Sequence, residues 1–372
     1  MQDIMGIINL SEKEDAIKEI TYNRPIATIP IAGRYRVIDF VLSNMVNAGI
    51  QNVSIFTQGK CRSLMQHLET GKEWDLNRKI DGLFVFNPVI NSSDTILSKG
   101  DIKNFKDQMD YIKQSKQNYV LLSRSYMICN VDYIDAFKYY KESNADITIL
   151  YKKVDTNNEK FLNCDTLNLN ENGNVISIGK NVGNKDSYNI SMEMYIMKKN
   201  LLLEMIENSI SIGDNAYLKE AIHNNISNLN VNAYRFNGYL ACINSIENYY
   251  KSSIELLDVD ISEELFYKNG YIYTRVRDEA PTKYSNSSHV VNSFIANGCI
   301  IEGTVENSII ARGVKVKKGA IVKDSVIMQK CVVEEDTILK HVVLDKNVNI
   351  SKNKVLCGDM KKPLVVKKNL NL

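Results

Sequence analysis

The carboxyl-terminal part of the chain carries a repeat of six residues, which constrains the fold more than any other feature. Apolar residues recur six apart from Val314 to Ile350, and the residue before each is often small. A period of six is typical of a β-helix, in which every turn buries a side chain against the next coil. A β-sandwich of short strands, the alternative, would not keep this period. The repeated positions are Val314, Ala320, Val326, Val332, Ile338, Leu344 and Ile350.

The chain before about residue 255 has a different pattern, because strand and helix signals alternate along it. Residues 34–48, for example, place Val37, Val41, Leu42 and Met45 on one helical face. Repeated βα units predict an α/β domain, Rossmann-like, with a mixed, mostly parallel sheet covered by helices on both faces. The expected strands are residues 4–10, 52–57, 119–123 and 146–151, and the expected helices are residues 34–48, 61–69 and 133–143.

These two patterns predict a division into domains. We expect an α/β domain over residues 1–255 and a β-helix domain over residues 286–372. Residues 256–285, which include Pro281 and a charged stretch, are expected to connect them.

Composition excludes several classes of protein. With 372 residues, 44% of them hydrophobic and 24% charged, the chain is long enough for two soluble domains. No apolar run reaches the roughly 18 residues of a membrane span, and a net charge of +2 favours neither nucleic acid nor a membrane as partner. The seven cysteines are dispersed and form no CxxC pair, which indicates reduced thiols and a cytoplasmic location.

The turn after the first expected strand is unusual for a protein that binds nucleotides. Such turns hold phosphate with backbone N–H groups, and glycines allow the close approach. Residues 9–15 read NLSEKED, with no glycine and with three acidic residues, Glu12, Glu14 and Asp15. Carboxylates facing a triphosphate would repel it.

One segment carries a resemblance to a known family. Residues 32–60, AGRYRVIDFVLSNMVNAGIQNVSIFTQGK, closely resemble the ADP-glucose pyrophosphorylases (glucose-1-phosphate adenylyltransferases). Further similar segments are residues 191–197, 217–222, 243–257 and 292–310. The resemblance implies a nucleotidyltransferase domain followed by a left-handed β-helix of hexapeptide repeats. It also implies a reaction in which ATP and glucose 1-phosphate give ADP-glucose and pyrophosphate, with Mg²⁺ held by carboxylates.

The chain departs from the family at the residues that would do this chemistry. The resemblance places Tyr126 and Cys242 at the two metal-binding aspartates, and Glu193 at a glycine of the sugar pocket. An uncharged phenol and a neutral thiol are poor ligands for Mg²⁺. We therefore expect no catalytic residue, no metal and no cofactor, as in the non-catalytic, GlgD-type subunits of the family.

Other positions of the family are kept. Gln58, Gly100, Ser191 and Lys219 match residues of the nucleotide and sugar-phosphate pocket, so a residual pocket is expected there. Arg24, Arg34 and Arg36 match a basic region that binds phosphorylated effectors in the family, and ordinary surface arginines are the alternative. His341 stands at a regular coil position, which disfavours a catalytic histidine of an acyltransferase.

Together these residues predict a regulatory, catalytically impaired subunit of glucose-1-phosphate adenylyltransferase in bacterial glycogen biosynthesis. Its expected partner is a catalytic paralogue, in a heterotetramer, and its expected effector is a sugar phosphate or an adenine nucleotide. Two alternatives stay open: an active adenylyltransferase with relocated metal ligands, and a stand-alone module that senses a nucleotide or sugar phosphate.

Overall fold

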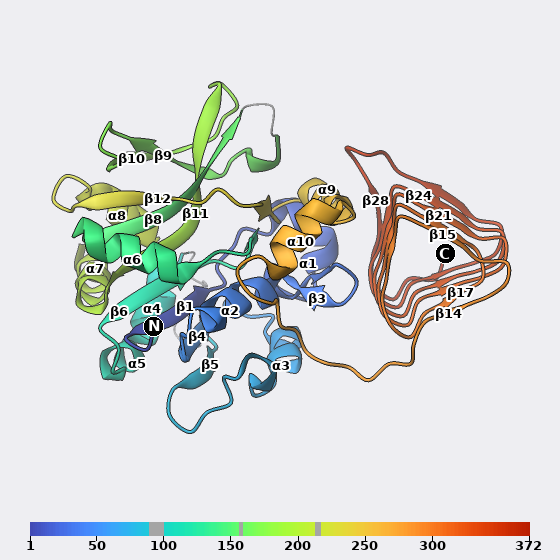
Figure 1. Cartoon of the computed structure of the whole chain (residues 1–372), viewed down its shortest axis with the longest axis horizontal. Coiled ribbons are helices and arrows are strands. Elements are labelled where there is room, and N and C mark those ends of the chain that lie inside the picture. Colours follow the sequence, from blue (N-terminus) through green and yellow to red (C-terminus); the bar gives the residue numbers. More distant parts are fainter. Residues whose placement is uncertain (89–99, 156–158, 213–216) are drawn as a thin grey trace. The chain divides into compact units, whose positions relative to one another are not determined.

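The computed structural model describes residues 1–88, 100–155, 159–212 and 217–372 (Figure 1). These residues pack into two compact units. The first consists of residues 1–12, 40–240 and 269–272, and the second of residues 13–39, 241–268 and 273–372. Residues 13–39 and 241–255, which the change of pattern groups with the α/β domain, and residues 256–268 of the expected connection thus pack with the β-helix. The packing follows tertiary contacts, whereas the expected boundaries at residues 255 and 286 follow the secondary structure.

The first unit is built on a mixed sheet of nine strands. Its path runs β10-β9-β11-β6-β1-β4-β5, and β8 joins β11 to β12. The pairs β1–β4, β1–β6 and β4–β5 are parallel, whereas β11 runs antiparallel to β6 and β8. The strands are β1 (Ile4–Asn9), β4 (Asn52–Phe56), β5 (Gly82–Phe86), β6 (Tyr119–Ser123), β8 (Ile147–Asp155), β9 (Asp165–Leu169), β10 (Val175–Lys180), β11 (Ser187–Lys198) and β12 (Val231–Arg235).

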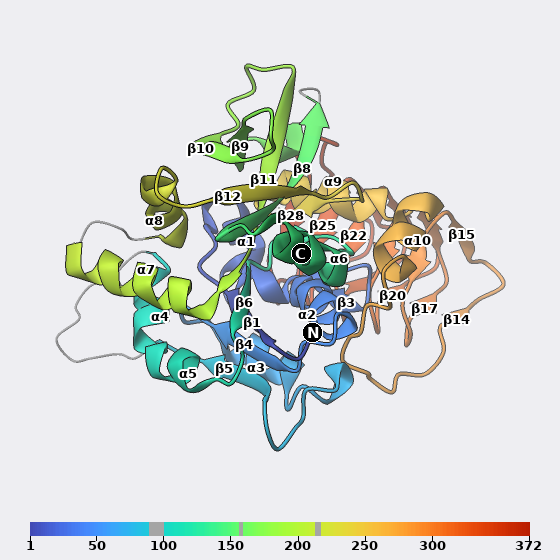
Figure 2. The same ribbon diagram turned by 60° about the vertical axis from the view of Figure 1, so that its left-hand side comes forward.

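Helices cover both faces of this sheet. Met5 and Ile7 of β1 belong to one apolar core with α4, α5, α7 and α8, while the alternate residues Ile4 and Ile8 are buried on the opposite face. Figure 2 shows α4, α5, α7 and α8 on the same side of the sheet. The helices are α2 (Val37–Asn47), α3 (Arg62–Leu68), α4 (Ile102–Asp107), α5 (Met109–Gln114), α6 (Tyr133–Ser143), α7 (Lys199–Ile212) and α8 (Leu218–Asn225).

The predicted α/β elements are confirmed, often to the residue. Helix α6 spans residues 133–143 as expected, and β6 spans residues 119–123. Asp132 caps α6, since its side chain accepts hydrogen bonds from the backbone N–H groups of Ile134 and Asp135. No helix among the residues described is long and apolar enough to span a membrane.

The second unit contains three parallel sheets of five short strands, which confirms the β-helix. Each coil contributes one strand to each sheet, and equivalent residues of successive coils pair in register. The sheets are β14 (Lys283–Tyr284), β17 (Ile300–Ile301), β20 (Lys315–Val316), β23 (Val332–Val333) and β26 (Asn349–Ile350); β15 (His289–Val291), β18 (Thr304–Glu306), β21 (Ile321–Lys323), β24 (Ile338–Lys340) and β27 (Val355–Cys357); and β16 (Phe294–Ile295), β19 (Ile309–Ile310), β22 (Val326–Ile327), β25 (Val342–Leu344) and β28 (Leu364–Val366).

The exact period of six describes only part of the interior: Val314, Ala320, Leu344 and Ile350 lie in the β-helix core, but the other repeated positions do not. Lys315 pairs with Val332 and Val332 with Asn349, so these coils repeat after 17 residues and not 18. One side of each coil is therefore a residue shorter, and the inward series shifts relative to the six-residue positions. Ile338, expected inside, is 39% exposed, whereas its neighbour Leu339 is fully buried. The inward series is Val316, Val322, Ile327, Val333, Leu339, Leu344 and Ile350, all of them buried.

The corners of the coils explain which residues the repeat requires. Asn307, Asp324 and His341 occupy equivalent corners and have φ of 45°, 46° and 50°. Asn, Asp, His and Gly tolerate this left-handed backbone better than other residues do. At the adjacent position, the hydroxyl of Ser308 accepts a hydrogen bond from the backbone N–H of Ser325 (3.0 Å), one coil further on. His341 is thus a corner residue of the coil, as its place in the repeat indicates.

The third sheet is apolar on both of its faces because a helix covers the outer one. Helix α9 (Ile246–Glu255) packs against β22, and the outward residues Ile309, Val326 and Val343 are buried. The hydroxyl of Tyr250 donates to the carbonyl of Asp324 (2.6 Å). The expected connection also contains a helix, α10 (Val259–Tyr267). The remaining short strands and helices of the second unit are α1 (Lys18–Thr21), β2 (Pro30–Ile31), β3 (Tyr35–Arg36) and β13 (Ala241–Cys242).

The 17-residue coil predicts a large loss of stability for one of two adjacent substitutions and a small loss for the other. Leu339→Ala removes a fully buried side chain and should lower the free energy of unfolding by about 2–5 kcal/mol. Ile338→Ala removes a side chain that is 39% exposed and should cost less than about 1 kcal/mol. Denaturant unfolding of both variants measures this. A larger loss for Ile338→Ala would restore the strict period of six.

Candidate functional site

The strand order has a switch point at the carboxyl ends of β1 and β6, and we call the position between these two ends the crevice. From β1 the chain continues to β4 on one side, while β6 lies on the other side. Connections leave in opposite directions at such a point, and open α/β sheets bind ligands there. Ser11 and Glu12 follow β1, and Arg124, Ser125 and Tyr126 follow β6. These residues therefore line the position where a nucleotidyltransferase fold would hold its substrate.

The crevice contains a buried arginine surrounded by carboxylates. Arg124 is 8% exposed, and its guanidinium lies 2.9 Å from Asp101 and 3.2 Å from Glu193. It also donates a hydrogen bond to the hydroxyl of Ser11. Burial alone would lower the pKa of Arg124, but Glu193, Asp101 and Glu12 together raise it above its usual value. Arg124 is consequently charged and multiply paired.

Each acid of this cluster is held by a second contact. Glu12 accepts hydrogen bonds from the backbone N–H and the hydroxyl of Ser125, both at 2.8 Å. Asp101 accepts from the backbone N–H of Leu218 at 2.6 Å. Burial raises the pKa of Glu12 and of Asp101, and the Arg124 guanidinium only partly offsets this. The turn after β1, which the sequence predicts to repel phosphate, is thus held by its own side chains.

Glu193 stands in a strained part of β11. Its φ is 51°, the left-handed region, and the pairing of β11 with β8 is interrupted between Ser191 and Tyr195. The backbone N–H of Glu193 donates to the Ser191 hydroxyl (3.2 Å), and its carboxylate accepts a hydrogen bond from the hydroxyl of Tyr126. Tyr126, expected at a metal position, therefore donates to a carboxylate.

The other retained pocket residues also have partners within the chain. Lys219 pairs with Asp165 at 2.5 Å. Burial and the nearby Glu193 raise the pKa of Asp165, while Lys219 opposes this effect. The Gln58 amide donates to the carbonyl of Gly100 at 2.7 Å. Gln58, Gly100 and Lys219 are each hydrogen bonded to a residue distant in sequence, and the hydroxyl of Ser191 accepts a hydrogen bond from Glu193, two residues further along β11.

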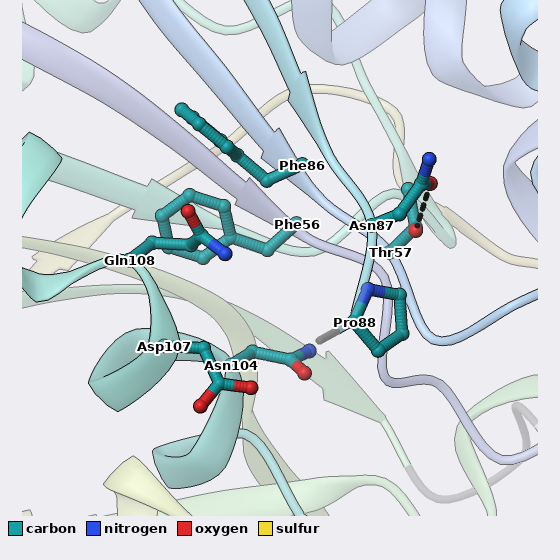
Figure 3. Close-up of a pocket in the computed structure, with 8 residues that line it drawn as sticks. All are labelled: Phe56, Thr57, Phe86, Asn87, Pro88, Asn104, Asp107 and Gln108. Atoms are coloured by element: carbon teal, nitrogen blue, oxygen red, sulfur yellow. Dashed lines mark hydrogen bonds between the residues drawn. The ribbon is translucent and has the colours of Figure 1, made fainter. Parts of the chain in front are cut away.

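A small pocket lies beside Gln58, at the ends of β4 and β5 (Figure 3). The rings of Phe56 and Phe86 form one side, with centroids 5.7 Å apart, and Asn104 and Asp107 of α4 form the other. At its rim the hydroxyl of Thr57 hydrogen bonds to the side-chain oxygen of Asn87 (3.0 Å).

The donor set at the two expected metal positions does not fit a magnesium ion. Tyr126 presents a phenol, and Cys242, in β13 of the second unit, presents a buried thiol. Hard cations such as Mg²⁺ require oxygen ligands, mainly carboxylates. Within the part of the chain that the structure describes, no three His, Cys, Asp or Glu side chains are arranged to hold a metal.

A second cluster of charges lies within the second unit. Arg24 is 5% exposed and pairs with Asp345, and its Nε donates to the carbonyl of Ile20 (2.7 Å). Burial, reinforced by Arg36 and Arg24, lowers the pKa of Lys346 to about 6, although Asp345 opposes this shift. The structure thus brings two of the three predicted arginines together with a lysine of the β-helix.

The same cluster extends beyond the predicted residues. Burial lowers the pKa of Arg36 to about 10, Asp39 offsets part of this, and Arg24, Arg277 and Arg275 lower it further. Arg34 is exposed, and its positive charge contributes to a lowered pKa of Arg312. We name these residues the cationic cluster: Arg24, Arg34, Arg36, Arg275, Arg277, Arg312 and Lys346, with Asp39, Glu279 and Asp345 as acidic neighbours.

Sequence reasoning missed Arg124, Asp101 and Lys346. A charged residue directly after the apolar run YVLLS was a signal for Arg124, because residues at the carboxyl end of a parallel strand face the ligand crevice. No signal in the sequence could have paired Arg124 with Glu193, which is 69 positions further on.

Comparisons with known proteins agree with this architecture. The nucleotidyl transferase family model matches residues 17–240, and a GlmU-like, C-terminal hexapeptide model matches residues 279–363. A glycogen biosynthesis protein GlgD of Bacillus subtilis is 39% identical over 99% of this chain and 96% of its own length. A GlgD of Geobacillus stearothermophilus is 38% identical, over 86% and 82%. A glucose-1-phosphate adenylyltransferase of Mycoplasma mobile is 29% identical, over 86% and 84%.

The raised pKa of Glu12 predicts a dependence of stability on pH. A carboxyl whose pKa is higher in the folded than in the unfolded chain binds more protons when folded, so its contribution to stability falls as pH rises through this window. The window begins near the unfolded pKa of about 4.3 and extends to the raised value. Glu12→Gln removes this contribution, so the variant should gain stability relative to wild type as pH rises from about 4, near the unfolded pKa, to about 7.

Urea unfolding of wild type and variant at both pH values measures this difference. Glu207→Gln is the control, because Glu207 is half exposed and pairs with Lys113 on the surface. A constant difference between wild type and Glu12→Gln would contradict the assignment.

Proposed function

Since the chain belongs to the nucleotidyl transferase family, we propose that it acts in bacterial glycogen biosynthesis as a regulatory subunit of glucose-1-phosphate adenylyltransferase. It also belongs to the family of the GlgD glycogen biosynthesis proteins, because it is 39% identical to one of them along nearly its whole length. Its activity alone is little or none, and it modulates a catalytic paralogue in a hetero-oligomer in the cytoplasm. The single observation that carries this proposal is the crevice, where a buried arginine is paired with the chain's own carboxylates.

The chemistry of adenylyl transfer requires more than the pocket offers. Transfer to glucose 1-phosphate needs cationic and N–H donors on the triphosphate and a metal ion held by carboxylates. Here Arg124 in the crevice and the nearby Lys219 are already in ion pairs. The metal positions hold Tyr126 and Cys242, and no cofactor is proposed for this chain.

Regulation has a candidate site in the cationic cluster of the second unit. Among the residues that the structure describes, the cluster contains seven basic groups, and the acids that act most strongly on them are Asp39, Glu279 and Asp345. A partly buried excess of positive charge favours a polyanion, and phosphate and carboxylate are the groups that arginine forks bind best. We assign a phosphorylated effector to this site. A subunit can pass such binding to its partner if its contacts differ between the active and inactive states of the complex.

An activity assay distinguishes the proposed regulatory subunit from an active adenylyltransferase. The purified chain, incubated with ATP, Mg²⁺ and glucose 1-phosphate, should release no pyrophosphate above background, whereas its addition to the catalytic paralogue should change the paralogue's rate or effector response. Tyr126→Asp alone should not create activity, because a single carboxylate does not supply the second metal ligand or the phosphate donors. Pyrophosphate release by the chain alone would establish an active adenylyltransferase instead, and failure to associate with the paralogue would favour a stand-alone sensor.

A second prediction concerns anion binding by the cationic cluster. Since the pKa of Lys346 is about 6, this lysine gains its charge as pH falls, so a bound anion should be held more tightly at about pH 6 than at about pH 8. Sulfate is the probe because its charge is constant over this range. At a concentration 100 times its Kd, it would stabilise the folded chain by about 2.7 kcal/mol.

Thermal unfolding with and without sulfate at the two pH values tests this. Lys346→Met should remove the pH dependence of the sulfate effect, and Arg277→Ala should weaken the effect at both values. Lys361→Ala, an exposed lysine outside the cluster, is the control for the general stabilisation by sulfate. Equal sulfate effects in wild type and both cluster variants would refute the site.

A further inference from the structure

The crevice between β1 and β6 is filled by the chain itself. Arg124 connects three segments that are distant in sequence: the turn after β1 through Ser11, the start of α4 through Asp101, and β11 through Glu193. A guanidinium has five N–H donors in a rigid fork, so it can serve several acceptors at once. One side chain therefore joins the elements that would have to separate to admit a ligand.

The backbone of Glu193 indicates that this contact is built in. A glycine adopts φ near 51° at no cost, whereas a glutamate there is strained by roughly 1 kcal/mol or more. Such strain persists only where surrounding interactions hold it. Here the carboxylate is 9% exposed and is bound by Arg124 on one oxygen and by the Tyr126 hydroxyl on the other. The strained backbone of Glu193 thus places its carboxylate against the guanidinium of Arg124.

The charges of the cluster oppose a further anion. Two cations, Arg124 and Lys219, lie among four carboxylates, Glu12, Asp101, Asp165 and Glu193, and a third cation, Lys180, acts on Asp165 from the edge of this set. A nucleotide or sugar phosphate would add negative charge to this set, and burying an unpaired charge is costly. To bind Arg124, the phosphate would have to displace a carboxylate, which would then be left buried without its partner.

We propose that Arg124 is an internal counter-ion that closes the crevice. The carboxylate of Glu193 binds the guanidinium of Arg124 at the place where a phosphate would otherwise bind. The crevice then excludes nucleotides and sugar phosphates, and any such ligand acts on the chain elsewhere. This inference deepens the proposed lack of catalysis and names the residues that cause it. It predicts two results for the isolated full-length chain, both measurable by hydrogen exchange with peptide resolution.

The first result concerns ligands. Millimolar ATP with Mg²⁺, or glucose 1-phosphate, should leave exchange unchanged in wild-type peptides that cover residues 9–12, 121–127 and 191–195. Because the readout is local, anion binding by the cationic cluster does not interfere with it. Ligand-dependent protection of these peptides in the wild type would overturn the proposal.

The second result concerns the arginine. Arg124→Ala should accelerate exchange of the Ser125 and Leu218 amides, which donate to Glu12 and Asp101, by about tenfold or more. Exchange in the centre of β4, away from the cluster, should change less. Arg124→Lys keeps the charge but lacks the fork, so an intermediate acceleration is expected, and this variant serves if Arg124→Ala does not fold.

Lys113→Ala is the matched control, because it removes an ion pair with Glu207 that is about half exposed. It should leave the crevice peptides unchanged. Wild-type exchange rates at both amides in Arg124→Ala, or in a folded Arg124→Lys, would show that the arginine does not close the crevice. Neither result involves the catalytic paralogue, so the proposal can fail while the regulatory function holds, and the reverse.

Discussion

The structure of the first unit depends on how charge is neutralised at the carboxyl ends of its central strands. Strands β1 and β6 lead into turns that carry Glu12, which is half-buried, and Arg124, which is buried. A buried charge is tolerated only with a partner and hydrogen bonds. In a ligand-binding crevice part of that compensation comes from the ligand. Here Asp101, Glu193 and Ser125 supply it from within the chain, so the fold is complete without a bound molecule.

The second unit treats charge in the opposite way. Around Lys346 the basic groups outnumber the acidic ones, and burial together with Arg36 and Arg24 lowers the pKa of this lysine to about 6. An excess of like charge destabilises the folded state, and a bound anion would reduce this destabilisation. The first unit thus pairs its buried charges with its own groups, whereas basic groups outnumber acidic ones in the cationic cluster of the second. This contrast favours regulation through the cationic cluster over chemistry in the crevice.

Local patterns in the sequence were sufficient for most of the fold. The alternating strand and helix signals identified β6 and α6 to the residue, because an apolar run and a capped amphipathic segment are local features. The β-helix was also identified, but only some of its inward residues were: Val314, Ala320, Leu344 and Ile350 belong to its core, whereas Ile338 does not. Ile338 and Leu339 are both apolar, and only the pairing of successive coils decides which of them is buried. The Arg124 cluster was out of reach for the same reason, since it joins residues of distant segments through tertiary contacts alone.

Under the proposed regulatory function, the lack of catalysis and the retention of the fold both follow from one feature, the internal pairing of Glu193 with Arg124 and Tyr126. A site that binds triphosphate and metal must leave donors and acids unpaired before its ligands arrive, and this costs stability. In this chain a tyrosine hydroxyl and an arginine guanidinium bind the same carboxylate, that of Glu193. The strain at its φ of 51° is retained because these contacts outweigh it. Under the same proposal, the elements that these contacts join serve as a rigid support for the surfaces that meet a partner.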